Sequence, residues 1–78
     1  MTNIKFAERL KQAMKEKGIS VKQLSDKSGV ASHTIYAYMN PDSYKWNARN
    51  PTMINFESLC DVLEVSMDWL WGRTDERT

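Results

Sequence analysis

Apolar residues recur along this chain every three or four positions, the spacing that gathers side chains on one face of an α-helix. No stretch alternates apolar and polar residues in the way that an amphipathic β-strand does. The first apolar stripe predicts a helix that begins after Asn3, as its N-cap, and ends at Gly18. Its expected inner face consists of Phe6, Leu10, Ala13 and Met14.

The stretch of residues 20–40 has the pattern of two short helices with a single glycine between them. Ser20 and Gln23 have the spacing of a capping box, which predicts that a second helix begins there. Gly29 is expected to end that helix, and a third helix is expected to follow and to stop before Pro41. The residues expected to face inward are Leu24, Ile35, Tyr38 and Met39.

Helical periodicity is absent between Asn40 and Pro51, where two prolines and three asparagines predict an irregular loop. Thr52 is then expected to cap a fourth helix, and Ser66 a short fifth helix that Gly72 closes. The inward-facing residues would be Met53, Phe56, Leu59, Cys60 and Leu63 in the fourth helix and Trp69 and Leu70 in the fifth. The pattern as a whole predicts an all-α fold of five short helices.

The 78-residue chain is long enough for one domain with a modest core. We expect residues 1–72 to form that domain and residues 73–78 to be a flexible C-terminal tail. No apolar run approaches the roughly 18 residues of a membrane span, and the N-terminus lacks the apolar core of a signal peptide, so the expected location is the cytoplasm. Because Cys60 and His33 are the sole cysteine and histidine, neither an intramolecular disulfide nor a zinc cluster is expected, and no cofactor is predicted.

The net charge of +1 conceals an uneven distribution of charged residues. Residues 1–50 contain nine lysines and arginines against four acidic residues, whereas residues 51–78 contain two arginines against six acidic residues. A basic first part and an acidic last part are typical of a molecule that turns one side toward a polyanion. The same distribution also fits charged residues that merely keep helix faces in solvent, and charge alone does not separate the two interpretations.

Two short helices joined at a tight glycine corner are typical of the helix-turn-helix arrangement, here over about residues 20–40. Gly29 occupies the corner, where a left-handed backbone conformation costs a non-glycine residue roughly 1 kcal/mol or more. The side chains of Leu24, Val30 and Ile35 are expected to wedge the two helices together. The outer face of the third helix would then present, either to solvent or to a ligand, Ser32, His33, Tyr36 and Ala37.

The stretch ISVKQLSDKSGVASHTIYAYM, residues 19–39, resembles the helix-turn-helix of the Cro/repressor DNA-binding domains of xenobiotic-response-element type. FAERLKQAMKEKG, residues 6–18, is similar to the first helix of that family. RNPTMINFESLCDVLEVSMDWLWGRTD, residues 49–75, is similar to its proline, fourth helix, Val-Ser pair and Asp-Trp-Leu ending. The resemblance covers about residues 4–75, is strongest to small phage and prophage regulators, and implies a lambda-repressor-like fold.

The resemblance also implies that the third helix enters the DNA major groove and that the start of the second helix contacts the phosphate backbone. The base-reading positions of the family fall on Ser32, His33, Tyr36 and Ala37. A histidine donates to guanine O6 or N7, and the alternative for His33 is a side chain that is merely solvated. An alanine contacts a thymine methyl, and the alternative for Ala37 is a position that simply tolerates a small side chain. The expected phosphate-binding residues are Ser20, Lys22, Gln23, Thr34, Asn40, Lys45, Arg49 and Asn50.

The helices depart from the family pattern at three positions. Val21 stands where the family often has a glutamine, which removes a common contact with DNA. Met14 and Met39 stand where the family often pairs an arginine with a glutamate. Because both of these positions differ together, we predict that a contact between two methionines replaces the ion pair.

The segment between the third and fourth helices is longer than the family usually has, by about residues 42–48. It contains Tyr44, Lys45 and Trp46. The tryptophan either folds back over the core or lies with the lysine against the DNA backbone or a second subunit. The role of this segment therefore stays open at the level of the sequence.

Two tryptophans lie close to the C-terminus in the expected fifth helix. Trp69 falls on a core position of the family, whereas Trp71 is expected to be either exposed or half-buried against the first helix or the C-terminal tail. Members of the family often dimerise through this end, so that two recognition helices meet successive major grooves. Trp69 and Trp71 are therefore the candidate dimerisation residues, and a homodimer is expected at least on DNA.

No arrangement of catalytic residues is apparent in the sequence. The acidic residues are scattered over helix surfaces, the one histidine has no nucleophile paired with it, and there is no glycine-rich phosphate loop. We therefore expect neither an enzyme nor a small-molecule ligand. The prediction is a transcriptional regulator of phage or prophage repressor type that binds a palindromic operator in double-stranded DNA. The alternatives are a controller protein of a restriction–modification system, an antitoxin with the same DNA module, and a helical protein-interaction module without DNA binding.

Overall fold

The computed structural model describes residues 4–40 and 52–76, which in this part of the chain form α-helices and no strand. Asn3, the predicted cap of the first helix, lies outside the described residues. The helices are α1 (Ile4–Lys17), α2 (Val21–Ser28), α3 (Ser32–Met39), α4 (Met53–Leu63) and α5 (Met67–Trp71). The predicted all-α fold of five short helices is confirmed.

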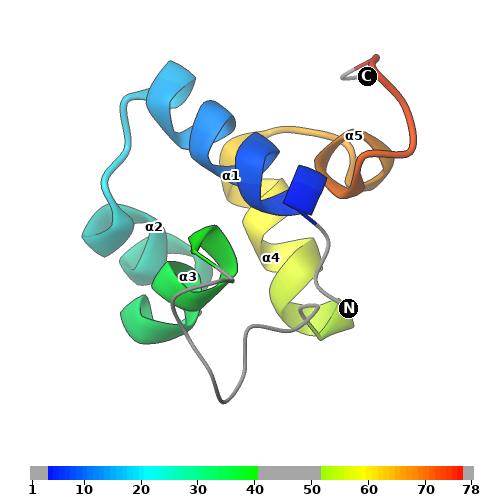
Figure 1. The fold of residues 1–78 in the computed structure, drawn as a ribbon. Coiled ribbons are helices and arrows are strands. Elements are labelled where there is room, and N and C mark those ends of the chain that lie inside the picture. Colours follow the sequence, from blue (N-terminus) through cyan, green and yellow to red (C-terminus); the bar gives the residue numbers. More distant parts are fainter. Residues whose placement is uncertain (1–3, 41–51, 77–78) are drawn as a thin grey trace.

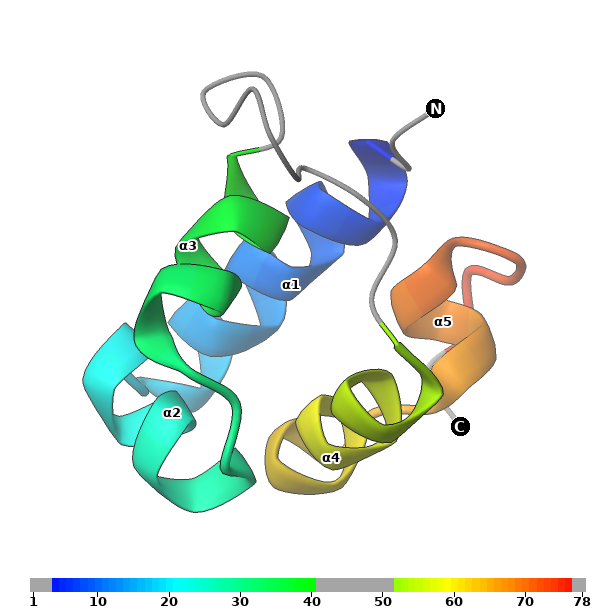
Figure 2. The same ribbon diagram turned by 90° about the horizontal axis from the view of Figure 1, so that it is seen from below.

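The helices form two groups that meet along α1 (Figures 1 and 2). On one side of the molecule α2 packs against α3, and on the other α4 packs against α5. The first helix contacts α3, α4 and α5, and α2 also packs against α4. The two groups therefore share one core, and the helix pair α2–α3 is supported by both α1 and α4.

The ends of several helices follow local signals in the sequence. α1 ends at Gly18, whose φ of 68° is left-handed, and the amide of Ile19 then donates to the carbonyl of Met14 at 3.0 Å. Ile19 packs against the core, as the residue after a glycine C-cap commonly does. The hydroxyl oxygens of Thr52 and Ser66 accept hydrogen bonds from the first turns of α4 and α5. The predicted caps of these helices are confirmed.

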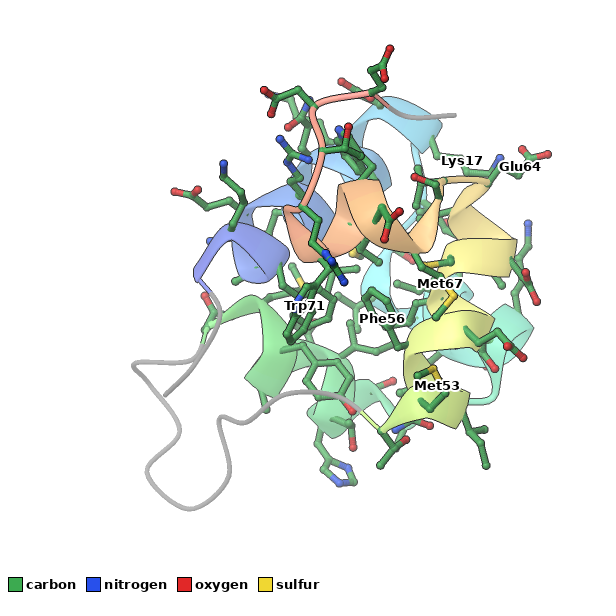
Figure 3. The ribbon with its side chains drawn as sticks, turned by 90° about the vertical axis from the view of Figure 1, so that its right-hand side faces the viewer. Lys17, Met53, Phe56, Glu64, Met67 and Trp71 are labelled. Carbon is green, nitrogen blue, oxygen red and sulfur yellow. The ribbon has the colours of Figure 1, made fainter. Side chains whose placement is uncertain are left out.

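The end of α4 carries no such signal, because the residue that closes it is not a glycine. Glu64 adopts the left-handed conformation, with φ 58° and ψ 45°, which is unfavourable for a residue with a Cβ atom. The Lys17 ammonium at the end of α1 donates to the Glu64 carboxylate. This hydrogen bond, together with the positive charge of Lys17, lowers the pKa of the Glu64 carboxyl. The pair lies at the end of α4 opposite to Met53 (Figure 3).

The core is centred on Phe6, which is 2% exposed and touches aromatic rings of three other helices. Its ring centroid lies 5.7 Å from that of Tyr38, 5.6 Å from that of Phe56 and 5.8 Å from that of Trp71. One side chain of α1 thus joins α3 to α4 and α5. The other buried residues of the core, all predicted to face inward, are Leu10, Ala13, Met14, Leu24, Val30, Ile35, Leu59, Cys60, Leu63, Trp69 and Leu70.

Met53 does not face inward. The prediction that it does is wrong, because 67% of this residue is exposed. Met53 shares a helix face with Phe56, but as the first residue of α4 it lies one turn beyond the core (Figure 3). Helical periodicity gives the direction of a side chain and does not show where the core ends.

The last described residues are held against α1 by Arg9. Its guanidinium lies over the Trp69 ring, 4.9 Å from the centroid, and donates to the Trp69 carbonyl at 2.7 Å. The same group donates to the carbonyl of Thr74 and forms an ion pair with Asp75 at 2.6 Å. Arg9 thus contacts Thr74 and Asp75 of the stretch predicted to be a flexible tail, residues 73–78, and the flexibility of that stretch stays a prediction.

Candidate nucleic-acid interface

The turn between α2 and α3 has the geometry that the sequence predicts. Gly29 has a φ of 80°, and its amide donates to the Ser25 carbonyl at 2.9 Å to close α2. Leu24 and Ile35 are fully buried and Val30 is 3% exposed, so the three apolar residues wedge the helices as expected. The pair of helices is therefore a helix-turn-helix with a fixed angle between its members.

The start of α2 presents hydrogen-bond donors at an exposed surface. Ser20 Oγ accepts from the Gln23 amide at 3.1 Å, and Gln23 Oε1 accepts from the Ser20 amide at 2.9 Å, which confirms the capping box. The carboxamide nitrogen of Gln23 and the Ser20 hydroxyl hydrogen remain as donors for a ligand. The exposed Lys22 adds a positive charge beside the positive end of the helix dipole, an arrangement that attracts anions.

The outer face of α3 carries polar side chains that reach solvent. His33 is exposed, Tyr36 is 45% exposed, and Ser32 and Thr34 are half-buried. Ala31, the residue before α3, supplies no side-chain cap to the first turn of the helix. Three of the four predicted base-reading residues thus line one accessible face, which the buried Ile35 and its neighbours hold from the opposite side.

Ala37 does not belong to that accessible face. The expectation that it lies on the outer surface is wrong, because only 3% of the residue is exposed. A single methyl group extends little beyond the helix backbone, so neighbouring groups cover it at a position where a longer side chain would reach solvent. The proposed contact of Ala37 with a thymine methyl is therefore withdrawn.

Among the remaining phosphate-binding candidates, Asn40 is exposed at the end of α3. Its side-chain amide donates to the Tyr36 carbonyl at 3.2 Å, and its backbone amide donates to the same oxygen at 3.0 Å. Asn40 therefore acts first as a C-cap that closes α3. The predictions for Lys45, Trp46, Arg49 and Asn50 lie outside the described residues.

The first turn of α4 adjoins α3, and sequence analysis assigned it no role in binding. The Asn55 side chain donates to the Tyr38 hydroxyl across the two helices at 3.1 Å. Met53 and Ile54 are 67% and 78% exposed. Within the described residues, these two and Tyr36 are the large apolar residues that are mostly or nearly half exposed. The accessible surface thus extends from the outer face of α3 to the start of α4.

A family profile of the Cro/C1-type helix-turn-helix DNA-binding domain matches residues 9–74. The chain belongs to this family. The match takes in the turn, both of its helices and the helices that support them. The Cro/C1-type fold is that of DNA-binding regulators of transcription, which agrees with the resemblance seen in the sequence.

Solved structures share the fold of this chain. The N-terminal DNA-binding domain of SinR from Bacillus subtilis matches with a TM-score of 0.74 and 32% sequence identity, over 91% of this chain and 96% of that chain. A structure of the SinR protein/SinI protein complex matches with a TM-score of 0.70 and 32% identity, over 83% of this chain and 58% of that chain. A comparison with curated protein sequences gives no match.

The departures of this Cro/C1-type domain from the family pattern have structural consequences. Val21 is half-buried and packs against the core, so the position serves packing in this chain. Met14 is 5% exposed in the core, and Met39 packs against the same cluster from α3. Both methionines therefore lie in or against the apolar core. Their direct contact with each other stays a prediction.

The two tryptophans of α5 pack within the single chain. Trp69 is 3% exposed, which confirms its core position and contradicts its assignment to a dimer surface. Trp71 is half-buried, and its ring lies 5.8 Å from Phe6 and 5.7 Å from Phe56 (Figure 3). Of the two positions weighed for Trp71, the structure shows the half-buried one. A role of Trp71 in dimerisation stays a prediction.

The described residues offer little beyond this interface for chemistry. Within them, no three side chains of the types that bind metals lie together. Cys60 is buried, and burial raises the pKa of its thiol to about 11, which keeps it in the unreactive protonated form. None of the described helices is long and apolar enough to cross a membrane.

Proposed function

We propose that this Cro/C1-type domain is a sequence-specific repressor of phage or prophage type that occupies a palindromic operator in double-stranded DNA. The observation that carries the proposal is the accessible polar face of α3. Its opposite face is locked by Ile35 and Tyr38, which are at most 7% exposed. A rigid helix with a polar outer face has the shape that the major groove admits.

Three side chains of α3 read the bases in this proposal. Ser32 both donates and accepts hydrogen bonds, and His33 donates to the O6 or N7 acceptor of guanine. The Tyr36 ring packs on a sugar or a thymine methyl, or its hydroxyl donates to a phosphate. The free amides at the start of α2 hold one phosphate together with Lys22 and Gln23. Further phosphate contacts are assigned to Ser20, Thr34, Asn40, Lys45, Arg49 and Asn50.

A palindromic operator requires two copies of the chain related by a twofold axis. Each copy places its α3 in one of two major grooves about one helical turn, roughly 34 Å, apart. The homodimer is therefore expected at least on DNA, where both copies bind side by side. A dimer bound to such an operator would block RNA polymerase from the same DNA, which accounts for repression.

The test is a selection from a library of random DNA duplexes, repeated with His33→Ala. We expect a palindromic motif for the unmodified chain. His33→Ala removes one base contact, which is worth about 1–3 kcal/mol, and relaxes the motif at one position of each half-site. Gln12→Ala, on the exposed surface of α1, is the matched control and leaves the motif unchanged.

The opposite result would be an absence of enrichment, with weak binding that ignores both sequence and salt. That outcome contradicts the proposal and favours the protein-interaction module. A controller protein or an antitoxin would give the same motif type, and a neighbouring methylase or toxin gene separates those alternatives from a phage repressor.

A further inference from the structure

One hydrogen bond connects the recognition helix to the first turn of α4. The side-chain amide of Asn55 donates to the hydroxyl of Tyr38 at 3.1 Å, across 17 positions of sequence. Tyr38 is 7% exposed and Asn55 is half-buried, so water competes little for the bond. Nothing in the sequence pattern marks these residues as partners.

Both partners are themselves held in place. The Tyr38 ring packs on Phe6, with ring centroids 5.7 Å apart. The backbone amide of Asn55 donates to the hydroxyl of Thr52, the N-cap of α4, at 3.2 Å. The bond therefore joins the last turn of α3 to the first turn of α4, and each partner is held by contacts within the domain.

Direct packing between α3 and α4 is sparse. α3 packs mainly against α1 and α2, and α4 packs mainly against α1, α2 and α5. Within the described residues, the Asn55–Tyr38 bond is the hydrogen bond that joins α3 to α4.

We propose that the Asn55–Tyr38 hydrogen bond is a positioning pair that sets the orientation of α3 and so determines how sharply the domain discriminates between base sequences. The inference rests on the proposed function. The base-reading side chains lie on the far side of a helix about 10 Å across, so a small rotation of α3 displaces them relative to the bases. Hydrogen bonds to base edges tolerate little displacement, whereas contacts with phosphates tolerate more.

The exposed apolar residues support a joint surface made by α3 and α4. Tyr36 projects from α3, and Met53 and Ile54 project from the same turn of α4 as Asn55. The hydrogen bond fixes the two elements that carry these side chains. A displacement of α3 would therefore change its position relative to the start of α4 as well as relative to the bases.

The experiment compares Tyr38→Phe, Asn55→Ala and the double variant with the unmodified chain. Tyr38→Phe keeps the ring contact with Phe6 and removes only the hydroxyl. The quantity measured is the ratio of dissociation constants for a scrambled duplex and for the selected operator, at one salt concentration. We expect this ratio to fall about 3- to 10-fold in each single variant, the range for loss of one hydrogen bond, with no further fall in the double variant.

Ser66→Ala is the matched control, because it removes a hydrogen bond of similar length, 3.1 Å, from the cap of α5. It lowers stability without changing the link between α3 and α4, and we expect its ratio to equal that of the unmodified chain. A ratio that falls as far in Ser66→Ala would show that loss of stability alone causes the effect and would overturn the inference.

Two further results would overturn the inference while leaving the proposed function intact. One is an unchanged ratio in Tyr38→Phe when the unmodified chain prefers its operator. The other is an equal loss of affinity for both duplexes in Asn55→Ala alone, which would make Asn55 a phosphate contact. Residual dipolar couplings of the free domain supply a test without DNA. We expect the α3–α4 angle to change in Tyr38→Phe, and an unchanged angle contradicts the positioning role even if no operator exists.

Discussion

The two sides of this molecule share a core but differ in the charges on their surfaces. The helices α2 and α3 hold two lysines and one aspartate, all exposed. The helices α4 and α5 contain neither lysine nor arginine, and their three acidic residues, Glu57, Asp61 and Asp68, are exposed, as is Glu64 at the C-cap of α4. An acidic surface repels the DNA backbone, so we expect the charges to orient the domain with α2 and α3 toward a duplex before any base is read.

The residues that hold the two sides together differ from the residues that each side exposes to solvent. The aromatic cluster around Phe6 belongs to both sides, whereas the polar face of α3 belongs to one. Changes in the cluster are therefore expected to affect the stability of the whole domain, and changes on the polar face of α3 are expected to affect mainly the interaction with DNA.

The largest expected effect follows from removing the side chain that joins the two sides. Phe6→Ala leaves a cavity bordered by Tyr38, Phe56 and Trp71, and such substitutions cost about 3–5 kcal/mol. We expect the free energy of unfolding in urea to fall by that amount and both sides to unfold in one transition. Phe6→Leu retains most of the volume and serves as the control with a smaller loss. Two separate transitions in the unmodified chain would contradict a shared core.

The next effect concerns the corner between α2 and α3. Gly29 has a φ of 80°, and a Cβ atom placed on it meets nothing within 4 Å. Gly29→Ala therefore adds only the backbone cost of a left-handed residue, about 1–2 kcal/mol in the free energy of unfolding. Gly29→Asn is the control, because asparagine adopts this conformation more readily. Equal losses in both variants would point to a clash in place of backbone strain.

A charge comparison tests the orientation on DNA directly. Lys22→Gln removes a proposed phosphate contact from α2, and Glu57→Gln removes one of the exposed acids of α4. We expect Lys22→Gln to flatten the dependence of log binding constant on log salt by about 0.9 and Glu57→Gln to leave that slope unchanged. The slope is measured by titration of a labelled duplex at several salt concentrations. A changed slope in Glu57→Gln would place the acidic side near the DNA.

The smallest effect concerns the pH dependence of the Lys17–Glu64 pair. The pKa of the Glu64 carboxyl is lowered in the folded domain, so the pair stabilises the fold above the unfolded pKa of a glutamate. That contribution is lost as the pH falls through the lowered folded pKa. We expect Glu64→Gln to be slightly less stable than the unmodified chain at neutral pH and equal to it in strong acid, by thermal unfolding. Glu57→Gln, on the same helix, is the control without this crossover.

Local signals in the sequence predicted most of the fold because they act through neighbouring residues. The capping box at Ser20, the C-cap at Gly18 and the corner at Gly29 depend on atoms within a few positions of each other. Helical periodicity predicted the core for the same reason. It was wrong for Met53 and Ala37, because a helix face shows direction and not how far neighbouring elements extend.

The contacts that sequence analysis missed join distant parts of the chain. Arg9 reaches Asp75, and Asn55 reaches Tyr38, through side chains whose types are common on any helix surface. Glu64 adopts a left-handed backbone conformation, which the sequence does not indicate because the residue is not a glycine. The polar face of α3 was predicted from the helix-turn-helix pattern, whereas its link to α4 required the three-dimensional arrangement.

The most direct measurement is a titration of the isotope-labelled domain with its selected operator, followed by nuclear magnetic resonance of the backbone amides. We expect the largest shifts at the start of α2, along the outer face of α3 and in the first turn of α4. The amides of Glu57, Asp61 and Asp68 on the acidic side are expected to keep their positions. Shifts concentrated on α4 and α5, with α3 unaffected, would contradict the assignment of α3 as the element that reads DNA.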